Sequence, residues 1–170
     1  LTGYFTSEAQ VIAVAKQITT LKVLNQNLHV LVDPVIGDHG QLYVGQKVAE
    51  AIRDVLLPLA TITTPNVFEL QWLAGTPNRE NAVEKLGRPE TIITSVPESD
   101  DELATELQLR GVLRRHVSPR LTAVPHGTGD FLAGCYLAER LMHSPEFAFE
   151  KAMQRLEHAI SKSTGSPALR

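Results

Sequence analysis

Four consecutive residues, Gly127, Thr128, Gly129 and Asp130, have the types and spacing that phosphoryl transfer could use. Glycines let a backbone approach a ligand closely, and free N–H groups at a helix N-terminus attract an anion such as phosphate. A carboxylate in the first turn could accept the proton of an attacking alcohol. The same residues also fit an ordinary helix start, with Thr128 as the cap and Asp130 complementing the helix dipole.

Two further polar motifs follow short apolar runs that we expect to be strands. Asp33 and Asp38 follow one run, and two carboxylates there can hold a cation or its waters. Asn66 and Glu69 follow another, and their spacing lets both face one ligand across a helix start. The alternatives are a turn for the first motif and a capping box for the second. All three motifs fall where an α/β sheet builds its site, which favours the functional interpretation.

Alternating helices and strands must position these motifs. Hydrophobic spacing predicts helices at 7–25, 48–59, 67–73, 81–86, 127–142 and 145–161, and strands at 28–32, 60–64 and 91–94. The segment 98–120 is polar and basic, and fits either edge strands or a mobile flap. This order predicts a parallel sheet with helices on its faces and ligands beyond the carboxyl ends of its strands.

Composition excludes several classes of function. The 170 residues suit one domain, and the net charge of -3 with interspersed signs shows no nucleic-acid footprint. Cys135 is the only cysteine, which excludes an internal disulfide and a Cys-rich zinc site and favours the reducing cytoplasm. No apolar run reaches the ~20 residues of a membrane span. Neither a P-loop nor a dinucleotide-binding fingerprint is present.

These motifs resemble the pyridoxal kinases of the ribokinase-like superfamily. Gly127 to Asp130 resembles the superfamily signature, and the segments 1–4, 33–38, 42–44, 57–60 and 64–69 resemble pyridoxal kinases in order and spacing. The resemblance implies one ribokinase-like kinase domain over residues 1–170. It also implies a three-layer α/β fold, with a mainly parallel sheet and helices on both faces, that lacks the N-terminal part of the family's fold. The stretches 78–89 and 98–120 are also short for the family.

The resemblance implies roles for the matched positions. Asp130 would be the base acting on the substrate, beside an anion hole of Gly127, Thr128 and Gly129. ATP and Mg²⁺ would be bound by residues that follow the strands: Asp33, Asn66, Val67, Phe68, Glu69, Thr94, Ser95, Leu121, Thr122, Ala123 and Thr128. Glu69 and Asp33 would serve the Mg²⁺, while Asp38 and Thr64 would help to hold a monovalent cation, K⁺ or Na⁺. Tyr4 would lie near the pyridine ring.

The implied activity is ATP-dependent phosphorylation of the 5′-hydroxymethyl group of pyridoxal, by a cytoplasmic enzyme that is a homodimer in its full-length form. The partners would be ATP and a pyridoxal-type small molecule, without nucleic acid or membrane. One alternative is a hydroxymethylpyrimidine kinase or another small-molecule kinase of the superfamily. The hydroxymethylpyrimidine branch typically has Cys where this chain has Asp130. The other alternative is a truncated, non-catalytic nucleotide-binding remnant.

Overall fold

A computed structural model describes residues 1–121 and 126–163 of the chain. The predicted residues Thr122 and Ala123 therefore lie outside the described part. The elements in chain order are α1 (Glu8–Leu24), β1 (Leu31–Val32), β2 (Gly37–Asp38), β3 (Gln41–Leu42), α2 (Gln46–Ala51), the π-helix η1 (Ile52–Leu56), the 3₁₀-helix η2 (Leu57–Leu59), β4 (Ile62–Thr63), α3 (Val67–Ala74), α4 (Arg79–Leu86), β5 (Glu90–Pro97), β6 (Glu102–Leu109), β7 (Val112–Pro119), α5 (Thr128–Arg140) and α6 (Pro145–Lys162).

The central sheet has the strand order β1-β4-β5-β6-β7. Strands β1, β4 and β5 run parallel, and β6 and β7 extend the sheet as an antiparallel hairpin. The segment at Thr2 adds a parallel bridge to Val32 on the other side of β1. The polar segment 98–120 thus forms edge strands, which was one of its two predicted forms.

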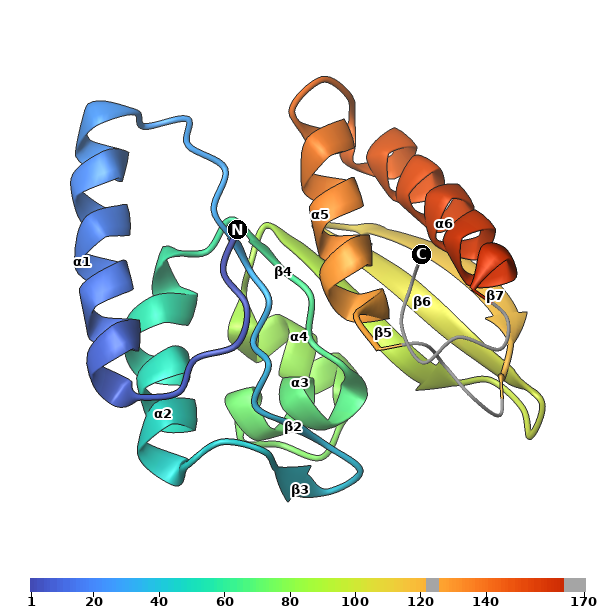
Figure 1. Ribbon diagram of the computed structural model, residues 1–170, viewed down its shortest axis with the longest axis horizontal. Coiled ribbons are helices and arrows are strands. Elements are labelled where there is room, and N and C mark those ends of the chain that lie inside the picture. The colour runs from blue at the N-terminus through green and yellow to red at the C-terminus, as the bar shows by residue number, and fades with distance from the viewer. Residues whose placement is uncertain (122–125, 164–170) are drawn as a thin grey trace.

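Helices cover both faces of this sheet (Figure 1), as the sequence predicts. Helices α5 and α6 pack on one face, while α1 to α4 lie on the other. Side chains of adjacent residues in a strand point to opposite faces. Accordingly, Leu31 belongs to the core under α5 and α6, and Val32 belongs to the core under α1 to α4. The prediction of an α/β fold with helices on both faces is confirmed.

Local signals account for where the helices begin and end. The Ser7 hydroxyl caps α1, and Asn78 and Ser144 cap α4 and α6 in the same way. Helix α3 ends at Gly75, whose left-handed backbone with φ of 62° suits glycine. The helix predicted over 48–59 is observed as α2, η1 and η2 in succession. No helix in the described ranges is long and apolar enough to cross a membrane.

Candidate functional site

The ends of β1, β4 and β5 meet at one edge of the sheet. The backbone N–H of Thr94 donates to the carbonyl of Pro65 over 3.0 Å, and Asn66 forms a parallel bridge with Thr94. The Thr64 hydroxyl donates a 2.8 Å hydrogen bond to the buried carboxylate of Asp33. The strand ends that the sequence singled out are therefore neighbours, as expected for parallel strands.

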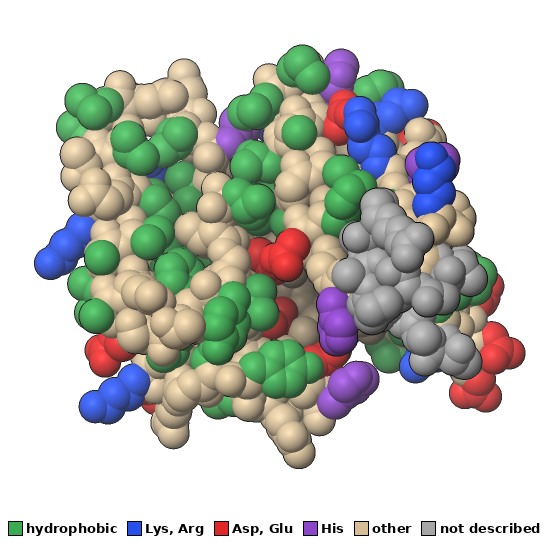
Figure 2. All heavy atoms as spheres, in the orientation of Figure 1, with side chains coloured by type: hydrophobic (Ala, Val, Ile, Leu, Met, Phe, Trp, Pro, Cys, Tyr) green, Lys and Arg blue, Asp and Glu red, His purple; other side chains and the backbone are tan. Residues whose placement is uncertain are grey.

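A cavity of about 330 Å³ opens at this edge, between the end of β1 and the start of α5. Asp33 lines it on one side, and the segment from Gly127 to Asp130 lines it on the other, together with Val35 and His126. Figure 2 shows acidic and histidine side chains gathered around a hollow in the middle of this face. The structure thus brings together the two motifs on which the phosphoryl-transfer hypothesis depends.

The first turn of α5 is arranged differently from an ordinary capped helix start. Gly127, not Thr128, occupies the N-cap position, and its φ of 91° is a left-handed conformation that favours glycine. No side chain caps this end of α5. The first N–H groups of the helix are therefore available to bind an anion in the cavity, since a helix N-terminus carries partial positive charge. The alternative with Thr128 as cap is wrong.

The Asn66–Glu69 motif forms the capping box that was its structural alternative. The Asn66 side chain accepts from the N–H of Glu69, and the Glu69 carboxylate accepts from the N–H of Asn66, each over 2.9 Å. Glu69 also accepts from the N–H groups of Ile36 and Gly37, and Asn66 donates to the carbonyl of Gly37. Both residues therefore tie the β2–β3 hairpin to α3, and a role toward metal and phosphate stays a prediction.

The predicted cation residues do not form one cluster. Thr64 is hydrogen-bonded to Asp33, whereas the Asp38 carboxylate accepts from the N–H of His39 and lies 3.6 Å from its ring. Within the described ranges, no three His, Cys, Asp or Glu side chains group closely enough to hold a metal ion. A cation bound here would take most of its ligands from phosphate oxygens and water, which is the usual arrangement for Mg²⁺ beside a nucleotide.

Two buried carboxylates give this edge of the sheet its electrostatic character. Burial raises the pKa of Asp33 from 3.8 to about 6, against the Thr64 hydrogen bond, and the charge of Asp130 adds to the rise. Burial likewise raises the pKa of Glu69 to about 7, although three backbone N–H groups oppose it. A cationic ligand would relieve the cost of ionising these groups.

Thr94 and Ser95, the predicted nucleotide pair, lie at an irregularity in β5. The pairing with β6 shifts register between Ile93 and Val96. Ser95 has a φ of 56°, which is unusual for a residue other than glycine, and it is exposed. Strain of this kind costs about 1–3 kcal/mol and concentrates at functional positions. The bulge turns Ser95 out of the regular strand pattern next to the other strand ends.

The exposure of the remaining predicted residues does not assign them a ligand. Val67 and Phe68 are half-buried in the first turn of α3, and Leu121 is exposed. Tyr4 is 59% exposed, so the described residues do not enclose it in a vitamin pocket. Their roles toward ligands stay predictions.

Sequence reasoning missed two glycines that shape this edge. A Cβ atom on Gly3 would lie 3.5 Å from a carboxylate oxygen of Asp130, so the N-terminal segment passes close to the proposed base. A Cβ atom on Gly37 would lie 2.2 Å from the carbonyl oxygen of Gln41 and 2.6 Å from the Phe68 ring. The contacts of Gly3 with Asp130 and of Gly37 with Phe68 join residues far apart in the sequence, so no local pattern predicts them.

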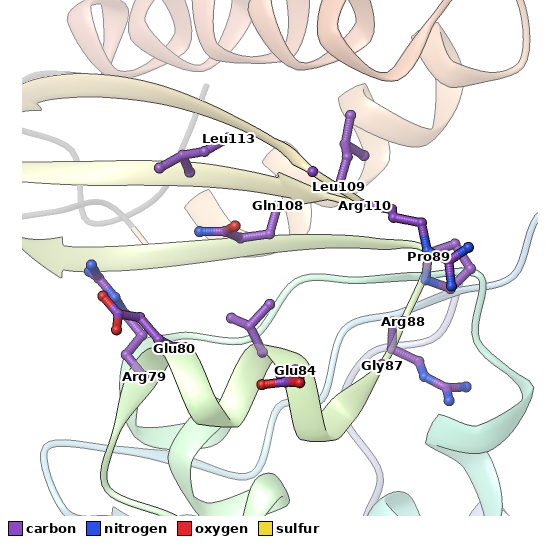
Figure 3. A pocket seen from close by; sticks show the side chains of 12 residues that line it. Arg79, Glu80, Glu84, Gly87, Arg88, Pro89, Gln108, Leu109, Arg110 and Leu113 are labelled. Atoms are coloured by element: carbon purple, nitrogen blue, oxygen red, sulfur yellow. The ribbon is translucent and has the colours of Figure 1, made fainter.

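A larger cavity of about 980 Å³ lies between α4 and the β6–β7 hairpin (Figure 3), away from these strand ends. Its arginines are largely engaged in structural contacts. Arg79 pairs with the buried Glu106, and Arg88 donates to the carbonyls of Leu86 and Pro58. The smaller cavity, where carboxylates meet an uncapped helix start, is therefore the better candidate site.

Comparison with known proteins shows which family the chain belongs to. The phosphomethylpyrimidine kinase family model matches residues 2–166, so the chain belongs to that family. It is 34% identical over 113 residues to the pyridoxal kinase of Arabidopsis thaliana, covering 66% of this chain and 36% of the relative. It is 29% identical over 190 residues to human pyridoxal kinase, covering 96% of this chain and 61% of the relative.

The solved structures agree with the sequence relatives. Pyridoxal kinase from Leishmania donovani in complex with ADP and pyridoxine superposes with a TM-score of 0.86 and 29% identity, over all of this chain and 66% of that one. The resemblance to pyridoxal kinases is therefore confirmed. The chain spans only part of its curated relatives, from 27% to 62% of their length.

Proposed function

We propose that this chain carries the ATP-binding and phosphoryl-transfer part of a pyridoxal kinase. The observation that supports this most directly is that Asp33 and Asp130 face one cavity beside the uncapped start of α5. Relatives named pyridoxal kinase, and a solved relative that holds ADP and pyridoxine, point to the same substrates.

In the proposed reaction, Asp130 accepts the proton of the 5′-hydroxymethyl group of pyridoxal. At the same time, the oxygen of that hydroxymethyl group forms a bond to the γ-phosphorus of ATP. The bond from that phosphorus to the oxygen bridging to the β-phosphate breaks, and ADP leaves. The N–H groups that open α5 stabilise the negative charge on the transferred phosphoryl group. Asp130 is exposed, lines the cavity and has no hydrogen-bond or ion-pair partner among the described side chains, which suits a base that must meet a substrate.

The strand-end carboxylates fit Mg²⁺ brought in with ATP. Asp33 faces the cavity with one oxygen held by Thr64, and the Glu69 carboxylate of α3 is buried and held by the N–H groups of Ile36 and Gly37. Bound Mg²⁺ would neutralise phosphate charge during transfer. A monovalent cation at Asp38 and Thr64, cytoplasmic localisation and a homodimer of the full-length protein are further predictions of the proposal.

The test is a substrate panel on the naturally encoded protein. We expect ATP-dependent phosphorylation of pyridoxal at a kcat/KM at least ~10-fold above that for hydroxymethylpyrimidine or ribose. A preference for hydroxymethylpyrimidine would instead place the chain in the other kinase branch.

The second candidate, a non-catalytic nucleotide-binding remnant, is favoured by Tyr4, which the described residues leave 59% exposed. Calorimetry with ATP and pyridoxal separately distinguishes the two. ATP binding without pyridoxal binding or turnover would support the remnant.

A further inference from the structure

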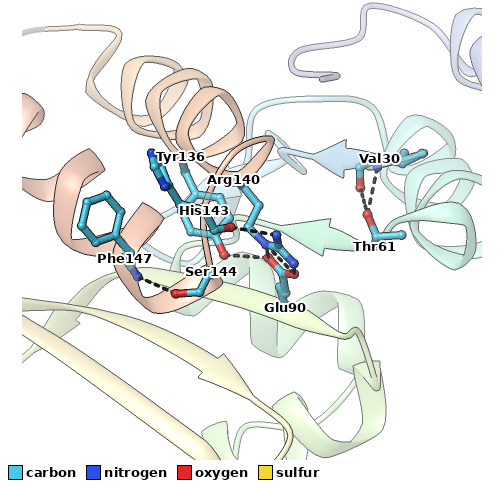
Figure 4. A network of polar contacts seen from close by, with 8 residues as sticks. All are labelled: Val30, Thr61, Glu90, Tyr136, Arg140, His143, Ser144 and Phe147. Carbon is cyan, nitrogen blue, oxygen red and sulfur yellow. Dashed lines mark hydrogen bonds and ion pairs between the residues drawn. The ribbon is translucent and has the colours of Figure 1, made fainter. Parts of the chain in front are cut away.

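A buried polar cluster lies at the other end of α5 from Asp130 (Figure 4). Glu90, the first residue of β5, accepts a 2.6 Å hydrogen bond from the Tyr136 hydroxyl. The same carboxylate accepts from the guanidinium of Arg140, with its Nε at 3.0 and 3.1 Å and its Nη2 at 2.9 Å. Arg140 also donates to the carbonyl of His143 in the turn to α6. We call Glu90, Tyr136 and Arg140 the Glu90 clamp.

The protonation states in this clamp suit its hydrogen bonds. Burial and the neighbouring Glu90 carboxylate raise the pKa of the Tyr136 hydroxyl, so this group remains a donor. Charge-assisted bonds of this kind are strong and have defined geometry. Both oxygens of Glu90 accept hydrogen bonds. The clamp therefore connects the sheet to α5, and through Arg140 to the turn that follows α5.

The clamp is the only polar side-chain link that the described residues provide between α5 and the sheet. The other contacts of α5 with the sheet are apolar, through residues such as Leu132 and Ala133. Its one other ion pair of comparable length, Glu139 with Arg155, joins it to α6. Apolar burial is non-directional, whereas charge-assisted hydrogen bonds have a defined geometry and fix the relative position of their partners. The start of α5 has no side-chain cap, so the clamp near its other end is the polar side-chain anchor that the described residues give this helix on the sheet.

Asp130 and Arg140 are ten residues apart on one helix, a rise of about 15 Å. A helix transmits a displacement at one end to the other, so a shift at Arg140 moves the backbone N–H groups and the carboxylate that line the cavity. We propose that the Glu90 clamp is a positioning device for phosphoryl transfer, which sets the distance between Asp130 with its helix start and Asp33. This inference rests on the proposed function.

The test compares Tyr136→Phe and Arg140→Gln with a matched control, Arg155→Gln, which removes the ion pair between α5 and α6 only. We expect kcat to fall ~10-fold or more in both clamp variants, because small displacements of reacting groups have large kinetic costs. We expect KM for ATP to change less than ~3-fold, and the control to retain wild-type kcat. Tyr136→Phe keeps the ring and the Glu90–Arg140 pair, so it remains informative if Arg140→Gln does not fold.

A second measurement does not depend on turnover. In backbone NMR spectra, the amide resonances of Thr128, Gly129 and Asp130 should shift in Tyr136→Phe but not in Arg155→Gln, since only the clamp joins α5 to the sheet through polar side chains in the described part of the chain. If the wild-type protein fails to phosphorylate any substrate, the proposed function fails and these shifts alone judge the clamp. Wild-type kcat in Tyr136→Phe, or unshifted amides at Thr128 to Asp130, would overturn the positioning role.

Discussion

Asp33, at the end of β1, and Asp130, in the first turn of α5, line the same cavity although they come from opposite ends of the chain. The charge of one bears on the protonation of the other. Burial raises the pKa of Asp33 to about 6, the Thr64 hydrogen bond opposes the rise, and the Asp130 carboxylate adds to it. The cavity is therefore lined by a carboxyl group whose ionisation a bound cation would favour.

This raised pKa predicts a pH dependence of stability. The folded-state pKa of Asp33, about 6, exceeds its ordinary value of 3.8, so its stabilising contribution is complete below pH 3.8 and is lost as pH rises through 6. Across that window, wild type should lose about 3 kcal/mol of unfolding free energy relative to Asp33→Asn. Urea denaturation of both proteins at pH 4 and pH 7.5 measures the difference. A difference that is the same at both pH values would contradict the shift.

Replacing Glu69 should destabilise the protein through lost backbone contacts. In Glu69→Ala the N–H groups of Ile36, Gly37 and Asn66 lose their acceptor, at a cost of about 2–4 kcal/mol. Glu80→Ala is the matched control, because Glu80 is also in the first turn of a helix but is exposed. It should change the unfolding free energy by less than about 0.5 kcal/mol. Equal effects of the two substitutions would refute the bridging role of Glu69.

Gly37 should tolerate no side chain. In Gly37→Ala the new methyl group would meet the Gln41 carbonyl and the Phe68 ring, so the β2–β3 hairpin must move, at a cost of about 1–3 kcal/mol. Gly134→Ala provides the contrast, since it lies within α5 and a Cβ there has nothing within 4 Å. That change should stabilise the protein by up to about 1 kcal/mol. Thermal unfolding of both variants tests the pair, and a neutral Gly37→Ala would show that the hairpin yields freely.

The sequence predicted the parts of the fold that depend on local patterns. Hydrophobic spacing located the helices. The motif from Gly127 to Asp130 lies at the start of α5 and lines the cavity at the strand ends. Asn66 and Glu69 show the limit of such reasoning, because one pattern encodes both a capping box and a ligand site. The structure shows that the capping box is formed.

Contacts between distant segments could not be predicted in the same way. The hydrogen bond from Thr64 to Asp33 and the Glu90 clamp each join separate elements, and their partners share no local signal. The family resemblance implies that Asp38 and Thr64 help to hold a monovalent cation, which stays a prediction, and it did not indicate that the Thr64 hydroxyl donates to Asp33. Side-chain partners at a strand end depend on the twist and register of the whole sheet, which a one-dimensional pattern does not specify.

The proton-accepting role of Asp130 is tested most directly by measuring ATP-dependent pyridoxal phosphorylation in Asp130→Asn beside wild type. Asparagine keeps the size and position of the side chain but cannot take up the proton of the hydroxymethyl group. We predict that kcat falls ~10²- to 10⁴-fold while the Kd for ATP stays within ~3-fold of wild type. Turnover equal to wild type in Asp130→Asn would contradict the account.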